Sequence, residues 1–152
     1  MAVLTSKYNR IIRDQQHEDI RTVSRAVSGA LLPGTFVTSS ATTLSQATTG
    51  AAGRLYLLGN RDFYDQDTLQ AYTSGETGVA YRLRPDLEVC AAVAAATYTF
   101  GQELTVGASG RLAAAASGNV VVAFFDDAAK AGVAQSAGAL CDVVIANAYT
   151  KA

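Results

Sequence analysis

The chain has 152 residues and a formal net charge of −1, a length that suits one domain of ordinary size. Hydrophobic residues make up 49% and charged residues only 16%, yet no apolar run approaches the roughly 20 residues that a membrane helix needs. The balanced charge gives no positive field to attract phosphates, so we expect neither a membrane protein nor a nucleic-acid-binding protein. The apolar excess predicts that a partner covers part of the surface.

Residues 1–17 are largely polar and charged and carry the apolar pair Ile11 and Ile12, which predicts an N-terminal arm that is ordered by contact. Charges interrupt this segment before an apolar stretch of signal-peptide length can form, so we expect no secretory leader. Residues 18–152 are predicted to form a single β-rich domain. Their first part, residues 18–32, has some helical spacing, but the extended segments that follow it favour a strand.

Turn residues then mark out short strands. Pro33 and Gly34 predict a turn that leads into a strand at residues 35–39. The small polar residues 39–53 predict an exposed loop or a weak edge strand, and β-prone residues return at 54–58.

A polar stretch of loop length follows at residues 59–78, and it carries Phe63, Tyr64 and Tyr72. Long loops in compact domains are often functional, and aromatic side chains within one indicate packing against something. The rings either contact a partner or fold back onto their own domain. We take this loop as an interface candidate.

Residues 78–84 alternate in polarity, which predicts a half-buried strand with Val79, Tyr81 and Leu83 on its apolar face. Residues 107–110 are Gly-rich and predict a hairpin, whereas the Ala-rich residues 127–138 predict a loop or a single turn. Further strands are predicted at residues 87–93, 103–106, 111–115, 119–125 and 140–148.

Short strands at this spacing, without alternation of strands and helices, indicate a mostly β protein. We predict a small antiparallel β-barrel or sandwich with an extended N-terminal arm and at most one or two short helices.

Residues that could carry catalysis are few. His17 is the only histidine, and it lies in a polar segment where it cannot by itself build a Ser-His-Asp or Cys-His system. Cys90 and Cys141 each lie in an apolar, strand-like run, which favours buried free thiols over a bridge between them. We expect no enzymatic activity, and a cysteine nucleophile at Cys90 or Cys141 remains the less favoured alternative.

Metal and cofactor motifs are missing as well. One histidine and two scattered cysteines do not supply the four ligands of a structural zinc site. Asp62, Asp65 and Asp67 lack the spacing, the central Gly and the closing Glu of a calcium loop. Asp126 and Asp127 are adjacent, which suits the end of a strand better than a shared acid-base site. No phosphate-binding Gly-rich motif stands between a strand and a helix, so we expect no metal and no cofactor.

Several segments in order resemble the capsid decoration, or cement, proteins of tailed bacteriophages. They are LPGTFV at residues 32–37, RLYLL at 54–58, AYTSGE at 71–76 and the long run from Tyr81 to Ala115. Within that run, residues 98–114 match best, because in such proteins an aromatic residue, Gly, polar and acidic residues, Leu and then a Gly-Arg-Leu hairpin often precede a returning strand. The resemblance covers about residues 32–147.

This resemblance implies a virion protein, made in the host cytoplasm, that binds the outer capsid surface and ties neighbouring capsomers of the major capsid protein together. It implies a homo-oligomer, for which we favour a trimer over a dimer, with a terminal arm on the capsid. The alternative is another virion component, such as a tail tube, head-completion or adhesin domain. The interface candidates are Tyr8, Ile11, Ile12 and Arg13 in the arm and Arg61, Phe63 and Tyr64 in the aromatic loop.

Overall fold

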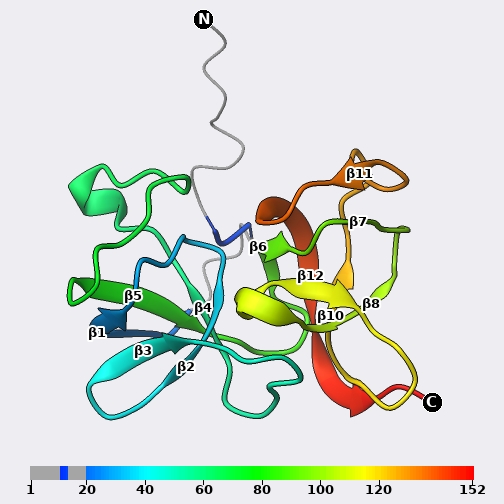
Figure 1. Cartoon of the computed structure of the whole chain (residues 1–152), viewed down its shortest axis with the longest axis horizontal. Helices are drawn as coiled ribbons and strands as arrows, with labels where there is room; N and C mark the ends of the chain where they lie inside the picture. The colour runs from blue at the N-terminus through cyan, green and yellow to red at the C-terminus, as the bar shows by residue number, and fades with distance from the viewer. Residues whose placement is uncertain (1–10, 14–19) are drawn as a thin grey trace, which may run out of the picture.

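A computed structural model describes residues 11–13 and 20–152 of the chain (Figure 1). The regular secondary structure of the described part is almost entirely β-strand, and its helical turns are limited to two short 3-10 segments, η2 (Asp62–Tyr64) and η3 (Ala108–Gly110). This confirms the predicted mostly β class with a barrel architecture. None of the helices in this part of the chain has the length and apolar character needed to cross a membrane.

The first half of the chain forms a closed five-stranded barrel, here called barrel 1. Around it the strands follow the order β1-β3-β2-β4-β5, and β5 pairs with β1 to close the ring. The pairing of β1 with β3 is parallel and the other pairings are antiparallel. Its strands are β1 (Thr22–Ser28), β2 (Phe36–Ser39), β3 (Thr43–Gln46), β4 (Tyr56–Leu58) and β5 (Thr77–Arg82).

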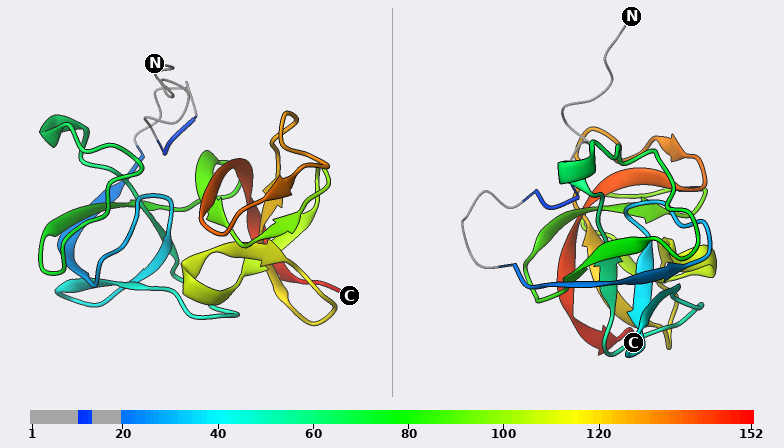
Figure 2. Two further views of the ribbon diagram at one scale, coloured as in Figure 1. Left: turned by 45° about the horizontal axis from the view of Figure 1, so that its top comes forward. Right: turned by 90° about the vertical axis from the view of Figure 1, so that its left-hand side faces the viewer.

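The second half forms another closed barrel, barrel 2, beside the first (Figures 1 and 2). Its strands follow the order β6-β9-β8-β10-β12, again closed on themselves with one parallel pairing, between β6 and β9. Two further strands, β7 and β11, pair with each other as a small ribbon above the barrel. The strands are β6 (Glu88–Val93), β7 (Ala96–Thr97), β8 (Glu103–Val106), β9 (Leu112–Ala114), β10 (Val120–Phe125), β11 (Ala134–Gln135) and β12 (Ala139–Thr150).

The two barrels are copies of one unit. Numbered within each barrel, the strands have the same order, first-third-second-fourth-fifth, and the same parallel pair. The registers also agree, because Val27 faces Leu44 in barrel 1 as Val93 faces Leu112 in barrel 2. Matching backbone hydrogen bonds recur outside the strands as well. The bond from Gly34 N to Leu58 O (2.7 Å) corresponds to Gly101 N to Phe125 O (2.7 Å), and Gly75 N to Val27 O (2.8 Å) corresponds to Gly138 N to Val93 O (2.9 Å).

The barrels share one hydrophobic cluster, which includes Phe36 and Leu57 of barrel 1 together with Val89 and Leu104 of barrel 2. A second cluster fills the interior of barrel 1 alone. Backbone hydrogen bonds also cross the junction, from Ala92 N to Gly34 O at 2.9 Å and from Gly50 N to Val106 O at 2.8 Å. The junction is therefore closely packed, with the two repeats in direct backbone contact. The predicted boundary after residue 17 falls outside the described residues and stays a prediction.

The structure corrects one local prediction in part and refines another. Within residues 39–53, β3 (Thr43–Gln46) pairs with β1 on one side and β2 on the other, so this part is an interior strand and not an edge strand, whereas residues 47–53 form no strand and match the predicted loop. Barrel closure allows small polar residues in such a strand, because only Leu44 needs to point inward. In β5 the inward residue is Ala80, whereas Tyr81 and Leu83 pack on the shared cluster between the barrels.

Gly110 gives a direct test of the close packing between the barrels. A Cβ atom at this position would lie 2.6 Å from the carbonyl oxygen of Phe36 in barrel 1, and the backbone φ is +64°. Gly118 has a similar φ of +85° but open space around it, so it isolates the cost of the backbone conformation.

We expect Gly118→Ala to lower the free energy of unfolding by about 1–2 kcal/mol, the usual cost of a left-handed residue with a side chain. Gly110→Ala should cost a further 1–3 kcal/mol or so, because the new methyl group overpacks the junction. Urea unfolding of both variants measures the difference. Equal losses would contradict the tight junction.

Candidate interaction surface

The described part of the arm, Ile11 to Arg13, lies along β6 of barrel 2 (Figure 1). Cys90 N donates to Ile11 O at 2.7 Å and Arg13 N donates to Glu88 O at 3.0 Å, so the segment adds to β6 as a short antiparallel strand. Ile11 is 1% exposed and belongs to the shared cluster, and Ile12 packs against its edge. Ile11 and Ile12 therefore pack against the hydrophobic core of their own chain.

Arg13 fixes the arm through charge. Its Nε lies 3.2 Å from Asp142 Oδ1, and a second guanidinium nitrogen lies 3.6 Å from Asp126 Oδ2. The repeat explains why the arm selects barrel 2. The register places Val79 of barrel 1 where Asp142 stands in barrel 2, so barrel 1 lacks this acidic partner.

Asp142 also accepts a hydrogen bond from the thiol of Cys90 at 3.2 Å. Burial, together with this hydrogen bond to a carboxylate, raises the pKa of Cys90 to about 12. At neutral pH the group therefore remains a thiol, the unreactive form of a cysteine. Cys90 and Cys141 are both buried and are not joined by a disulfide, which confirms the favoured prediction for them.

The aromatic loop between β4 and β5 is organised around Arg61. Its guanidinium lies 4.9 Å from the ring centroid of Tyr72 and 5.5 Å from that of Tyr64, and it forms an ion pair with Glu76 at 3.3 Å. The loop also has a polar interior, since Asn60 Nδ2 donates to Gln66 O at 3.0 Å and Gln66 Oε1 accepts from Arg61 N at 2.9 Å. These contacts give the long loop at residues 59–76 a defined shape.

The three aspartates of this loop serve its local structure. Asp62 accepts a hydrogen bond from Asn60, Asp67 accepts one from the backbone N–H of Leu69, and Asp65 occupies the left-handed position that ends η2. Within the described residues no group of three or more His, Cys, Asp or Glu side chains is placed to hold a metal ion.

Two large hydrophobic side chains among the described residues of the loop are exposed to solvent. Tyr64 is 70% exposed and Leu69 is 71% exposed. Tyr72, by contrast, is buried and donates a hydrogen bond to Gly59 O at 2.6 Å, so this ring folds back onto its own domain, whereas Tyr64 stays an interface candidate. Leu69 was not among the predicted residues, although its position in a polar loop was a signal that could have been used.

Barrel 2 exposes apolar side chains on the corresponding loops. Phe100, between the first and second strands of that repeat, is 61% exposed, and Val133, between its fourth and fifth strands, is 53% exposed. Leu32 is an exposed residue on the first of these loops in barrel 1. We call the four loops together the loop face: residues 29–35, 59–76, 94–102 and 126–138.

The loops of each repeat are tied to one another. Tyr72 N donates to Leu31 O at 2.8 Å in barrel 1, and Gly132 N donates to Tyr98 O at 2.8 Å in barrel 2. Figure 1 shows the η2 loop and the β11 loop at the same upper end of the two barrels. The repeat thus presents exposed apolar groups twice on one side of the molecule.

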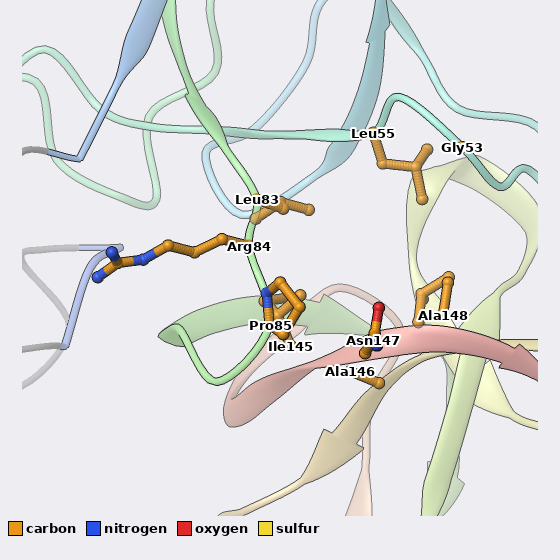
Figure 3. Close-up of a pocket in the computed structure, with 10 residues that line it drawn as sticks. Gly53, Leu55, Leu83, Arg84, Pro85, Ile145, Ala146, Asn147 and Ala148 are labelled. Atoms are coloured by element: carbon orange, nitrogen blue, oxygen red, sulfur yellow. The ribbon is translucent and has the colours of Figure 1, made fainter.

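A small cavity of about 120 Å³ lies at the junction between the two barrels (Figure 3). It is lined by the linker between the barrels, including Leu83 and Pro85, and by the second half of β12, and Arg84 points away from it. Its volume corresponds to about four water molecules at ~30 Å³ each. It is too small for a typical organic ligand.

The predicted interface residues thus fall into groups. Tyr8 lies outside the described residues, as does the side chain of Phe63. Ile11, Ile12 and Arg13 lie on barrel 2, and Arg61 holds the aromatic loop together. Of the predicted residues whose side chains the structure describes, Tyr64 is the one that is largely open to solvent.

Ile11→Ala tests whether the arm belongs to the folded core. Because the side chain is fully buried, we expect the free energy of unfolding to fall by about 2–5 kcal/mol. Ile12→Ala, at a half-buried position, should cost clearly less. Urea unfolding monitored by circular dichroism gives both values, and an unchanged midpoint for Ile11→Ala would show that the arm does not pack in solution.

Comparison with known proteins gives a fold relationship. No family model matches the chain, and a search of curated proteins finds no match either. Among solved structures, the chain is similar to the N base of the head fiber gp8.5 of bacteriophage phi29, with a TM-score of 0.59 and 12% sequence identity. The match covers 88% of this chain and 98% of that one, so the chain has the fold of a protein found in a bacteriophage head fiber.

Proposed function

We propose that the protein is a non-catalytic structural component of a bacteriophage head, and that it binds the outer surface of the capsid as a decoration protein. The observation that carries this proposal is the match over nearly the whole length of the phi29 head fiber base, which includes both barrels. The segments that resemble capsid decoration proteins point to the same part of a virion.

The loop face supplies the docking surface in this proposal. Burying a large apolar side chain contributes about 1.5–3 kcal/mol, so Tyr64, Leu69, Phe100 and Val133 together offer enough apolar surface for a specific contact. The loops that carry them are held by internal hydrogen bonds, which lowers the ordering cost on binding. The partner is the major capsid protein.

Repetition strengthens a modest contact on a symmetric shell. A homo-oligomer, with a trimer favoured over a dimer, would present several loop faces at once and bind through their combined affinity. The arm, with Tyr8, would extend the contact on the capsid. Nucleic acid and membranes play no part in this assembly.

The alternative is a different virion role. Because the chain is similar to a fiber base, an anchor for a fiber is the second candidate role beside a cement protein that stands alone. Native mass spectrometry distinguishes a head protein, whether a fiber anchor or a cement protein, from a component of the tail tube. A trimer supports a head protein, and a closed ring of six subunits favours a tail-tube protein.

The docking proposal is tested with purified protein and expanded, undecorated capsids. We expect saturable uptake at defined lattice positions. The double variants Tyr64→Ser/Leu69→Ser and Phe100→Ser/Val133→Ser should each weaken uptake by about 100-fold or more, from the loss of two buried apolar groups.

Tyr149→Ser is the matched control, because Tyr149 is an exposed ring near the end of β12, remote from the loop face (Figure 1). It should bind like the original protein. No uptake by the original protein would refute the proposed function, and full uptake by both double variants would refute the loop face as its site.

A further inference from the structure

The end of barrel 1 that lies opposite the loop face contains a polar concavity, which has no role in the proposed function. It has a volume of about 290 Å³ and lies at the β2–β3 hairpin, at the lower end of barrel 1 in Figure 1. We call it the barrel-1 mouth. It is lined by Arg25, Ser39, Ser40, Ala41, Arg54 and Tyr56.

Two guanidinium groups meet a set of hydroxyls here. Arg25 donates a hydrogen bond to Ser39 Oγ at 2.7 Å, and Arg54 donates one to Tyr56 Oη at 3.3 Å. A guanidinium carries five N–H donors, so most of them are left over. No carboxylate lines the mouth, and within the described residues neither arginine forms an ion pair.

Arg25 belongs to the inner side of its strand. It lies between Val23 and Val27, which pack on the cluster inside barrel 1, and alternate residues of a strand share a face. A charged group at such a position costs free energy unless it stays hydrated or meets an opposite charge. The structure of barrel 1 alone supplies only one neutral hydroxyl as its partner.

The internal repeat provides a comparison within the same molecule. The strand registers place Ala91 where barrel 1 has Arg25, Val106 where it has Ser39, and Ala123 where it has Tyr56. All three residues of barrel 2 are fully buried in the shared cluster. The same fold therefore closes this region with apolar side chains, and the polar set in barrel 1 is not needed to form a barrel.

From this difference we propose that the barrel-1 mouth binds a carboxylate-bearing sugar unit, such as a uronic acid within an acidic glycan. Guanidinium groups match a carboxylate in geometry and charge, and the serine and tyrosine hydroxyls suit a ligand that carries hydroxyl groups of its own. The volume is at the lower limit of small-ligand sites, and barrel mouths are a common location for them.

The mouth and the loop face lie at opposite ends of barrel 1, so one molecule can use both at once. On a decorated capsid the mouth would face away from the shell. The sugar site does not require the capsid role, because its evidence is the side-chain set and the repeat.

The test is titration calorimetry of the full chain with trigalacturonate at low ionic strength, where charge interactions are least screened. We expect saturable binding with one site per chain and none with the uncharged galactose trisaccharide. Arg54→Gln should weaken binding by about tenfold or more, as the loss of a hydrogen bond to a charged group does. Arg111→Gln removes the same charge from barrel 2 and should leave affinity unchanged.

A second variant separates binding from folding. Arg25→Ala/Ser39→Val gives barrel 1 the residues of barrel 2, so it should abolish binding while the thermal unfolding midpoint stays equal or rises. Absence of trigalacturonate binding by the original protein would overturn the proposal, as would undiminished binding by this double variant or a marked fall in its midpoint. Tighter binding of a glutamate-rich peptide or of inorganic phosphate at the mouth would overturn the assignment to a sugar acid.

Discussion

The structure depends on one edge of β6, where three separate segments complete the hydrogen bonding of a single strand. The backbone N–H of Cys90 donates to Ile11 of the arm, that of Ala92 to Gly34 of barrel 1, and that of Ala94, the residue directly after β6, to Leu112 of β9. Buried backbone donors must be paired, so removing any one segment would leave an unsatisfied group in the core. The arm, the first repeat and the second repeat are therefore stabilised together.

The two barrels share one strand order but carry different side chains at matching positions. Both keep the residues that close the fold, such as Val27 and Val93 or Leu44 and Leu112, at matching register positions. The barrels differ at positions that contact the arm or that face solvent. Barrel 2 has the carboxylates that hold Arg13, whereas barrel 1 has the polar mouth, and each carries its own exposed apolar loop residues. Positions that depart from the needs of the fold are where function is expected.

Much of the strand content could be predicted from the sequence because alternation and turn residues are local signals. The positive φ of Gly34 and the antiparallel β8–β9 hairpin are examples. The second barrel could not be predicted in this way. Its equivalence to the first rests on long-range pairing, and few side chains are shared: Phe36 in one repeat corresponds to Glu103 in the other. The strand β3 was missed because its polar residues show their role only when both neighbours are in place.

For the site, the sequence identified the aromatic loop but not which of its rings face solvent, since that is decided by the hydrogen bond of Tyr72 and the stacking of Arg61. The most direct test of the account is hydrogen–deuterium exchange on free and capsid-bound protein. It predicts new protection of the loop face, residues 29–35, 59–76, 94–102 and 126–138, with the β2–β3 hairpin unchanged. Protection of the hairpin with unaltered exchange across the loop face would contradict it.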